Sequence, residues 1–465
     1  MELKKYKLGE ILDVTRGASL SGEFYATEGK YIRLTCGNFD YQNNCFKENK
    51  SKDNLYYIGD FKPEFLMEEG DIITPLTEQA IGLLGSTAII PESGKYIQSQ
   101  DVAKIICKEE LLDKDFVFYL ISSTLVKQQL SAAAQQTKIR HTSPDKIRDC
   151  TVWIPELTEQ KRIGKLLRSL DRKIELNRAI NQNLEALAKQ LYDYWFVQFD
   201  FPDENGRPYK SSGGKMVWND KLKREIPEGW DDGILIDIAN ITMGQSPDGS
   251  SYNEVGEGML FYQGSTDFGM RFPSVRQYTT APSRFAKKGD ILMSVRAPVG
   301  SINIANNDCC IGRGLSAINS KLGSISHLYY ILNDLRIAFD QRNAAGTTFG
   351  SITKEDLYSL PIIIPSDEVI RAFDKICSPM FDRQMILGEE IDILTKQRDE
   401  LLPHLMNGQV SVNSDLAVSY IIYKNKIIRI MKENIIQAIV AKMQRDLDCR
   451  QMARLKAVLT SELHN

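Results

Sequence analysis

The sequence predicts an α+β protein in which two similar strand-rich domains are separated by two long helices that pair as an antiparallel coiled coil. Three observations support this fold class. Short motifs recur in the same order in the two halves of the chain. Each half carries Gly, Asn and Pro at the short intervals typical of strands and turns, and each half ends in a long amphipathic pattern. We therefore expect an internal pseudo-twofold repeat.

The repeat is clearest in a series of short matching strings. Their offset falls from 219 to 210 residues along the chain, as it does when loops gain or lose residues around a constant core. The matching pairs are Gly70–Pro75 with Gly289–Ser294, Ala80–Gly82 with Pro298–Gly300, Ala134-x-x-Thr137 with Ala344-x-x-Thr347, and Cys150–Pro155 with Leu360–Pro365.

The order of these patterns divides the chain into six segments. A strand-rich domain, a helix and a turn-rich linker are followed by a second domain, a second helix and a tail without a counterpart in the first half. The expected bounds are 1–155 for the first domain, 156–197 for the central helix, 198–226 for the linker, 227–365 for the second domain, 366–410 for the C-terminal helix and 411–465 for a helical tail of unknown role.

The two helical segments carry apolar residues at the alternating spacing of four and three that is typical of a coiled-coil seam. Polar Asn177 and Asn181 interrupt the first pattern, and Gly408 is the expected stop of the second helix. The expected seam residues are Ile163, Leu167, Leu170, Leu184, Leu187 and Leu191 in the first helix, and Phe373, Leu394 and Leu401 in the second. The alternative is two unrelated amphipathic helices, each packed on its own domain.

Composition excludes several classes of protein. Hydrophobic residues make up 42% and charged residues 26% of the chain, and the net charge is −3, which does not favour a disordered chain or a generic polycation. No apolar run approaches the roughly 20 residues of a membrane span, and the N-terminus does not resemble a secretory signal. Eight cysteines without a C-x-x-C pair and four scattered histidines predict no metal site. We expect a cytoplasmic protein that does not contact a membrane.

A search for catalytic motifs gives one candidate. The string Gly312-Arg313-Gly314 with Ala317 fits the glycine fingerprint of nucleotide-dependent oxidoreductases, but that fingerprint must open a helix. The residues that follow do not continue a helix, so a tight turn between strands is the better interpretation. The chain also lacks a P-loop, a methyltransferase motif loop and a G-x-S-x-G elbow. We expect no catalytic activity and no cofactor bound by this chain.

Two related domains on paired helices suit a partner with two similar sites at a fixed spacing, and duplex DNA is such a partner. Side chains that can reach base edges or phosphates occur in loops of both halves. The candidates are Arg16, Arg33, Thr35, Gln79, Gln100, Lys138, Arg140 and His141 in the first half, and Gln245, Ser246, Gln263, Ser265, Arg296, Arg313 and Thr347 in the second.

The second half resembles a target recognition domain of the DNA-specificity subunits of type I restriction–modification enzymes. The resemblance rests on Gly244–Pro247, Phe261–Gly264, Gly289–Leu292, Arg296–Gly300 and Ile311–Leu315, taken in this order, and it covers roughly residues 1–410. The segments Leu191–Phe196, Phe199–Pro202 and Ile226–Trp230 also resemble the region that joins the two halves of such subunits. The first half departs from the pattern, with Gly17-Ala18-Ser19 and Glu78–Gly82 in place of the corresponding strings.

The resemblance implies a non-catalytic subunit in which each domain reads one half of a bipartite, asymmetric DNA site. The helices would set the spacer, since a 40-residue helix is about 60 Å long and one DNA turn about 34 Å. The implied partners are double-stranded DNA, two methyltransferase subunits that use S-adenosylmethionine, and in some systems two restriction subunits that use ATP and Mg²⁺. The alternative function is a helical scaffold or adaptor that binds proteins and has no DNA role.

Overall fold

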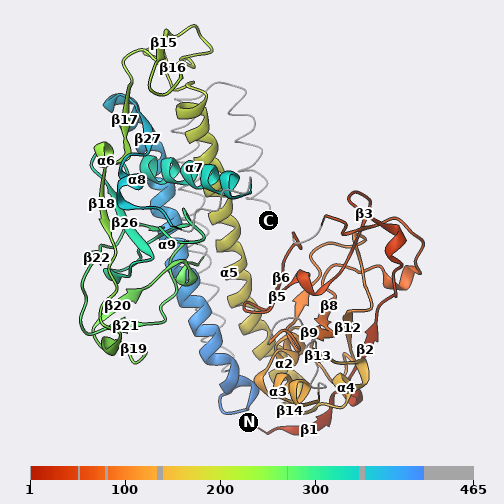
Figure 1. Ribbon diagram of the computed structural model, residues 1–465. Helices are drawn as coiled ribbons and strands as arrows, with labels where there is room; N and C mark the ends of the chain where they lie inside the picture. Colours follow the sequence, from red (N-terminus) through yellow and green to blue (C-terminus); the bar gives the residue numbers. More distant parts are fainter. Residues whose placement is uncertain are drawn as a thin grey trace. The chain divides into compact units, whose positions relative to one another are not determined.

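The computed structural model describes residues 2–50, 53–78, 82–133, 140–269, 271–344 and 351–412. The chain divides into two compact units (Figure 1). The first unit contains the chain up to Ile174 and again from Ile393, and the second unit contains Glu175–Asp392. Each unit therefore holds one strand-rich domain and a part of each long helix. The expected tail lies outside the described residues, except for its first two positions.

The strand-rich part of the first unit contains two four-stranded sheets. The first sheet has the order β10-β8-β12-β2, and the second has the order β11-β4-β7-β3 with a parallel β11–β4 pair. Their bounds are Leu12–Arg16 (β2), Tyr25–Ala26 (β3), Tyr31–Arg33 (β4), Tyr56–Tyr57 (β7), Ile72–Pro75 (β8), Ala88–Ile89 (β10), Tyr96–Ile97 (β11) and Val102–Cys107 (β12). Three two-stranded pairs complete this part: Lys4–Lys7 (β1) with Thr151–Ile154 (β14), Phe39–Asp40 (β5) with Cys45–Phe46 (β6), and Thr77–Glu78 (β9) with Arg140–His141 (β13). The short helices are Leu8–Ile11 (α1), Lys114–Ile121 (α2), Thr124–Ala133 (α3) and Pro144–Arg148 (α4).

The second unit repeats this topology. Its four-stranded sheet has the order β18-β26-β23-β24, and its five-stranded sheet has the order β19-β21-β20-β25-β22 with a parallel β20–β25 pair. The bounds are Ala239–Met243 (β18), Tyr252–Asn253 (β19), Met259–Tyr262 (β20), Tyr278–Thr279 (β21), Phe285–Ala286 (β22), Ile291–Ser294 (β23), Ile302–Ile304 (β24), Cys309–Ile311 (β25) and Leu315–Ser320 (β26). Two further pairs are Asp231–Ile234 (β17) with Pro361–Ile364 (β27), and Met216–Asn219 (β15) with Arg224–Pro227 (β16). The helices are Leu235–Ile238 (α6), Ile325–Ala344 (α7) and Lys354–Tyr358 (α8).

The motifs that repeat in the sequence occupy equivalent strands of the two units. Gly70 and Gly289 each precede the inner strand β8 or β23, with φ values of 82° and 93° that favour glycine. The strings that end at Pro155 and Pro365 form β14 and β27, and each of these strands pairs with the first strand of its domain. The internal duplication is therefore present in the sheet order as well as in the sequence.

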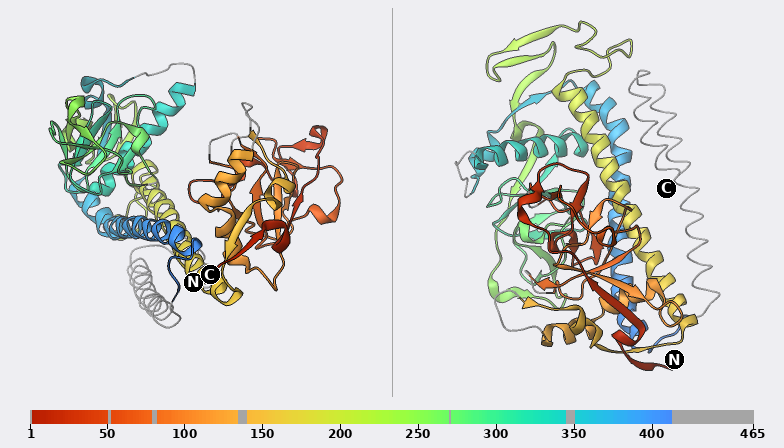
Figure 2. Two further views of the ribbon diagram at one scale, coloured as in Figure 1. Left: turned by 90° about the horizontal axis from the view of Figure 1, so that it is seen from below. Right: turned by 90° about the vertical axis from the view of Figure 1, so that its right-hand side faces the viewer.

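Two long helices follow the two domains. They are Leu157–Tyr192 (α5), which a π-helical turn extends to Val197, and Asp367–Met406 (α9). In the first unit Asp171 contacts Arg398, and in the second unit Asn177 contacts Glu390 and Asn181 contacts Gln384. Partner numbers fall on α9 as they rise on α5, so the helices pack antiparallel (Figure 2). Gly408, with φ of 70°, follows the end of α9 as the sequence predicts.

The apolar positions of the two helices are buried as the pairing prediction requires. Ile163, Leu167 and Phe373 are fully buried, and Leu170 and Leu191 nearly so. Leu184, Leu187, Leu394 and Leu401 are half-buried. The same faces also contribute to the cores of the domains: Ile163 and Leu167 pack with α2 residues in the first unit, and Leu191 packs with Phe373 and α7 residues in the second. Pairing and domain packing are thus combined rather than alternative.

The segment expected as a linker has substantial structure of its own. Phe199 and Phe201 are buried against Trp230, and the Phe201 and Trp230 rings stack with centroids 4.9 Å apart. The β15–β16 hairpin follows and leaves Trp218 exposed. No described helix combines the length and apolar character needed to cross a membrane.

Candidate nucleic-acid interface

Four strand ends meet at one edge of the second strand-rich domain. The Gln245 amide, after β18, donates to the Ile311 carbonyl at 3.0 Å, and the Gly312 amide donates to the Tyr262 carbonyl at 2.8 Å. The Val295 amide, after β23, donates to the Gly314 carbonyl at 3.0 Å. We call the loops 244–246, 263–265, 295–298 and 312–314 the second loop cluster.

Glycines make this close approach of loops possible. A Cβ on Gly244 would lie 2.2 Å from the Gly312 carbonyl oxygen, and a Cβ on Gly314 would lie 2.6 Å from the Gln263 carbonyl oxygen. Both contacts are with backbone, which cannot move aside cheaply. Residues 312–314 form the turn between β25 and β26, and residues 315–317 belong to β26, so the string does not open a helix, as the sequence predicts. This geometry does not fit the dinucleotide fingerprint, which places the phosphates at a helix N-terminus.

The side chains of the second loop cluster suit base-edge recognition. Gln245, Gln263, Arg296 and Arg313 are exposed, and Ser246 and Ser265 are half-buried. The Ser246 hydroxyl accepts from the Arg313 amide at 3.3 Å, which links the first and last loops. Arg and Gln are the side chains that bond guanine and adenine edges in pairs of hydrogen bonds. Of the candidates in this half, Thr347 lies outside the described residues.

The first strand-rich domain builds the equivalent edge with other residues. The Ala18 amide, after β2, donates to the Gln98 carbonyl at 2.9 Å, and the Leu34 amide donates to the Ile97 carbonyl at 2.9 Å. A Cβ on Gly17 would lie 2.2 Å from the Gln98 carbonyl oxygen, the same constraint as at Gly244. We call the segments 16–19, 34–36, 76–78, 98–101 and 140–142, which are loops together with the ends of β2, β9 and β13, the first loop cluster.

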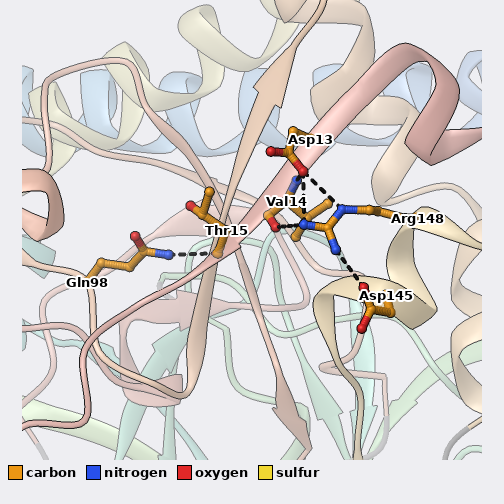
Figure 3. Close-up of polar contacts among 6 residues, drawn as sticks. All are labelled: Asp13, Val14, Thr15, Gln98, Asp145 and Arg148. Atoms are coloured by element: carbon orange, nitrogen blue, oxygen red, sulfur yellow. Dashed lines mark hydrogen bonds and ion pairs between the residues drawn. The ribbon is translucent and has the colours of Figure 1, made fainter.

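Polar contacts behind the first loop cluster hold its strands in place. The buried Gln98 side chain donates from Nε2 to the Thr15 carbonyl at 2.9 Å (Figure 3). It also donates to the Val102 carbonyl at 3.1 Å. Arg148, from α4, donates from Nε to Asp13 at 2.9 Å and from Nη2 to the Val14 carbonyl at 2.6 Å. The turn at 98–101 is therefore fixed to β2 and β12, and β2 is fixed to α4.

The candidates of the first half differ in their surroundings. Arg16, Gln100 and His141 are exposed, and the Arg16 Nε donates to the Gln100 carbonyl at 2.8 Å. Thr35 is half-buried and caps a short 3₁₀ turn. Gln79 and Lys138 lie outside the described residues. For Arg140 only the backbone is described, and it pairs with Glu78 in the β13–β9 ladder.

Arg33 lies in the interior of its domain. It is 7% exposed, its guanidinium stacks 3.9 Å from the Tyr25 ring centroid, and its Nη2 donates to the Asn54 carbonyl at 3.2 Å. This burial argues against a direct base contact by Arg33. The residue instead ties β4 to its neighbours, a role that depends on tertiary contacts.

The sequence analysis did not identify Thr77 and Cys36 of the first loop cluster as candidates. The Thr77 hydroxyl lies 3.3 Å from the Asp101 carboxylate and 3.3 Å from His141 Nδ1. The offset of 219 residues at Gly70 and Gly289 places Thr77 opposite Arg296, and this signal could have identified it. The Cys36 thiol donates to the Thr77 carbonyl, and burial raises its pKa to about 11, so this thiol stays neutral.

Metal chemistry has no support among the residues that the structure describes. No group of three or more His, Cys, Asp or Glu side chains gathers there in a way that could hold an ion. The two loop clusters present hydrogen-bonding and cationic side chains on rigid strand ends. This arrangement suits binding of a polar, anionic surface.

Comparisons with known proteins agree with this interpretation. A family model described as the type I restriction modification DNA specificity domain matches residues 1–186 and 227–398. The putative type I restriction enzyme MjaX specificity subunit of Methanocaldococcus jannaschii is 29% identical over 77% of this chain and 84% of its own length. The type I restriction enzyme HindI specificity subunit of Haemophilus influenzae is 24% identical over 68% of this chain and 81% of its own length.

A solved structure shares the fold. The crystal structure of the type I restriction-modification system S subunit from M. genitalium has a TM-score of 0.57 and 17% identity, and it covers 87% of this chain and 96% of that chain. The likeness supports two strand-rich domains with two long packed helices.

Proposed function

Because the chain belongs to the type I restriction–modification DNA specificity family, we propose that each strand-rich domain reads one half of a bipartite, asymmetric DNA site. The chain is the DNA specificity subunit of such a system and is not itself catalytic. The supporting observation is the repeated loop cluster. Both domains bring strand ends together through backbone hydrogen bonds and a glycine at the equivalent position, Gly17 or Gly244, yet they present different side chains.

The side chains that read bases are those exposed in the loop clusters. In the second cluster these are Gln245, Gln263, Arg296 and Arg313, with Ser246 and Ser265 beside them. In the first cluster they are Arg16, Gln100 and His141, with Thr35 beside them. Arg and Gln distinguish bases in the major groove through paired hydrogen bonds, each worth about 1–3 kcal/mol. Phosphate contacts from partner subunits would supply the rest of the affinity.

The partners follow from the family. The chain works in a type I complex that acts on double-stranded DNA. Two methyltransferase subunits would dock on the helices and domains and would use S-adenosylmethionine to methylate adenine. Two restriction subunits, where present, would add translocation and cleavage driven by ATP with Mg²⁺. The helices α5 and α9 would set the spacer between the half-sites, and the complex would work in the cytoplasm, where the DNA is. A scaffold without a DNA role does not account for the family match.

Genome-wide adenine methylation mapping tests this function. Cells that carry the chain and its methyltransferase should show one bipartite motif, which is absent when the gene is deleted. The variant Arg313→Ala should relax the motif at one position of one half-site, and Arg16→Ala should relax the other half-site. A matched control is Arg207→Ala, because Arg207 is exposed and lies outside both loop clusters. A motif that is continuous, or one that changes in both halves with either variant, would contradict modular reading.

A further inference from the structure

The seam between α5 and α9 contains buried polar side chains at positions where a coiled coil normally has apolar ones. In the first unit, Arg398 Nη1 donates to the Asp171 carboxylate at 2.9 Å, and both residues are 7% exposed. In the second unit, Asn177 donates to Glu390 at 3.0 Å. There Gln384 donates from Nε2 to the Asn181 carbonyl at 3.2 Å and to Glu185 at 3.1 Å.

These polar groups do not serve stability in the way that apolar residues would. Among the described residues, the Asn177 Oδ1, both side-chain polar atoms of Asn181 and the Gln384 Oε1 are buried without a hydrogen-bond partner. Buried polar groups with incomplete partners lower stability compared with leucine at the same positions. A single buried polar residue in a seam is, however, an effective way to fix the register of two helices.

The apolar part of the seam does not select one register by itself. Its residues recur every seven positions, so a slip of α9 by seven residues would again bring apolar side chains together. The polar pairs forbid that slip. Asp171 would then lie against Ile391 or Leu405 instead of Arg398, and Glu185 would lose Gln384 for Cys377 or Ile391. For Asp171, which is 7% exposed, the loss of its cationic partner is strongly unfavourable.

The polar pairs are not shared by equivalent positions of the two duplicated helices. With the offset of 210 residues that relates the two helices, Asp171 corresponds to Phe381 and Arg398 corresponds to Ala188. The pair that is ionic in the first unit is therefore apolar at the equivalent place in the second. Each unit has its own polar contacts, so they specify where α9 lies on α5 and not merely that two similar helices pair.

The same carboxylates also hold the strand-rich domains on the helices. In the first unit the Tyr119 hydroxyl, from α2, donates to Asp171 at 2.5 Å. In the second unit Arg271 donates to Glu185 at 3.0 Å, is 8% exposed, and lies 4.5 Å from the Phe381 ring centroid. Each carboxylate on α5 thus bonds a residue of α9 and a residue of the domain in its unit. In each unit, one carboxylate therefore contacts both α9 and the strand-rich domain, and it links the register of the helices to the position of that domain on α5.

We propose that these buried polar contacts fix the register of α9 on α5 and thereby select the spacer length of the DNA site. The first domain leads directly into α5 and the second directly into α9, so a slip between the helices displaces one domain along the other's helix. A slip of seven residues is about 10 Å, or about 3 base pairs. Asp171, Asn177, Gln384 and Arg398 are positioning residues for spacer specificity, and Asn181 contributes its backbone carbonyl. The inference rests on the proposed reading of a bipartite site.

The test replaces the polar seam residues by leucine in the full chain, assembled with its methyltransferase. The five-residue variant D171L/N177L/N181L/Q384L/R398L should methylate the same two half-site words as the wild type. It should do so at additional spacers, about 3 base pairs longer or shorter, in at least a tenth of all methylated sites. The matched control L170I/L187I changes the apolar seam and keeps the polar contacts, and it should retain a single spacer.

Three further variants keep the test decisive if the five-residue variant does not fold. The variant N177L/N181L/Q384L leaves the Asp171–Arg398 ion pair in place, so it should fold and keep a single spacer. The charge exchange D171R/R398D should restore a single spacer, whereas D171R alone should not. A folded five-residue variant, or a folded D171R variant, that methylates only at the wild-type spacer would overturn the proposal. Absence of any bipartite motif in wild-type cells would instead remove the proposed function, before a variant is scored.

Discussion

Acidification should destabilise the second unit through one buried histidine. His327, at the start of α7, is 3% exposed, and its ring lies 4.6 Å from Phe196 and 6.4 Å from Phe373, measured between centroids. Burial lowers its pKa to about 4, and the nearby Asp374 carboxylate opposes this only in part. In the unfolded chain the pKa is about 6.5. The unfolded state therefore takes up a proton as the pH falls below about 6.5, while the folded state stays neutral until about pH 4.

The expected magnitude follows from the two pKa values. The free energy of unfolding decreases as the pH is lowered wherever the unfolded state binds more protons than the folded state. Between pH 7 and pH 5 this histidine alone should lower the free energy of unfolding by about 2 kcal/mol. The experiment compares urea unfolding of the wild type and His327→Leu at both pH values, with amide exchange in α7 as the local readout. The exposed His404, changed to Leu, is the matched control. Carboxyl groups such as Asp334 and Asp392, whose pKa burial raises, act in the opposite direction but equally in all three proteins.

The reasoning would be refuted if His327→Leu lost as much stability as the wild type between the two pH values. It would also be refuted if the His404 control reduced the loss equally. In either case the proton uptake would belong to other groups.

Three further predictions concern the helices and the loops. Arg398→Ala should lower the free energy of unfolding of the first unit by about 3–5 kcal/mol, because Asp171 keeps a buried charge without its ionic partner; urea denaturation measures this. Phe373→Ala, at a fully buried ring, should lower it by about 3–5 kcal/mol in the second unit, and Phe373→Leu by much less. Gly314→Ala should weaken binding to DNA that carries the second half-site by about tenfold, the loss of about one base contact, because the added Cβ meets the Gln263 carbonyl oxygen at 2.6 Å. Gel-shift titration of the folded variant measures this loss.

Much of the fold could be predicted because its signals are local. The strings ending at Pro155 and Pro365 mark the last strand of each domain, since proline ends a strand and suits the first turn of a helix. The spacing of apolar residues predicted the two long helices, and Gly408 predicted the end of the second. The repeat added the information that the two sets of strands have the same order. These features depend on neighbours within a few residues or on comparison of the chain with itself.

The remainder depends on contacts between residues far apart in sequence. The sequence predicts Arg33 as an exposed cation. In the structure it is buried against the Tyr25 ring and bonds the Asn54 carbonyl, and no local sequence pattern predicts these contacts. Asn177 reads as an interruption of the seam, whereas its partner Glu390 lies 213 residues away. The candidate base contacts themselves stay predictions, because exposure makes a side chain available and does not choose its base.

The two loop clusters also indicate why the half-sites should differ. Gly17 and Gly244 carry the same constraint, since a Cβ on either would lie 2.2 Å from a carbonyl oxygen of the neighbouring turn. The next residue is under no such constraint, and it is Ala18 in one domain and Gln245 in the other. An alanine offers a base only an apolar contact, for example with a thymine methyl, whereas a glutamine can bond an adenine edge twice. Backbone packing thus preserves the position of each loop while leaving its side chain free to change, so one duplicated scaffold presents two different reading surfaces.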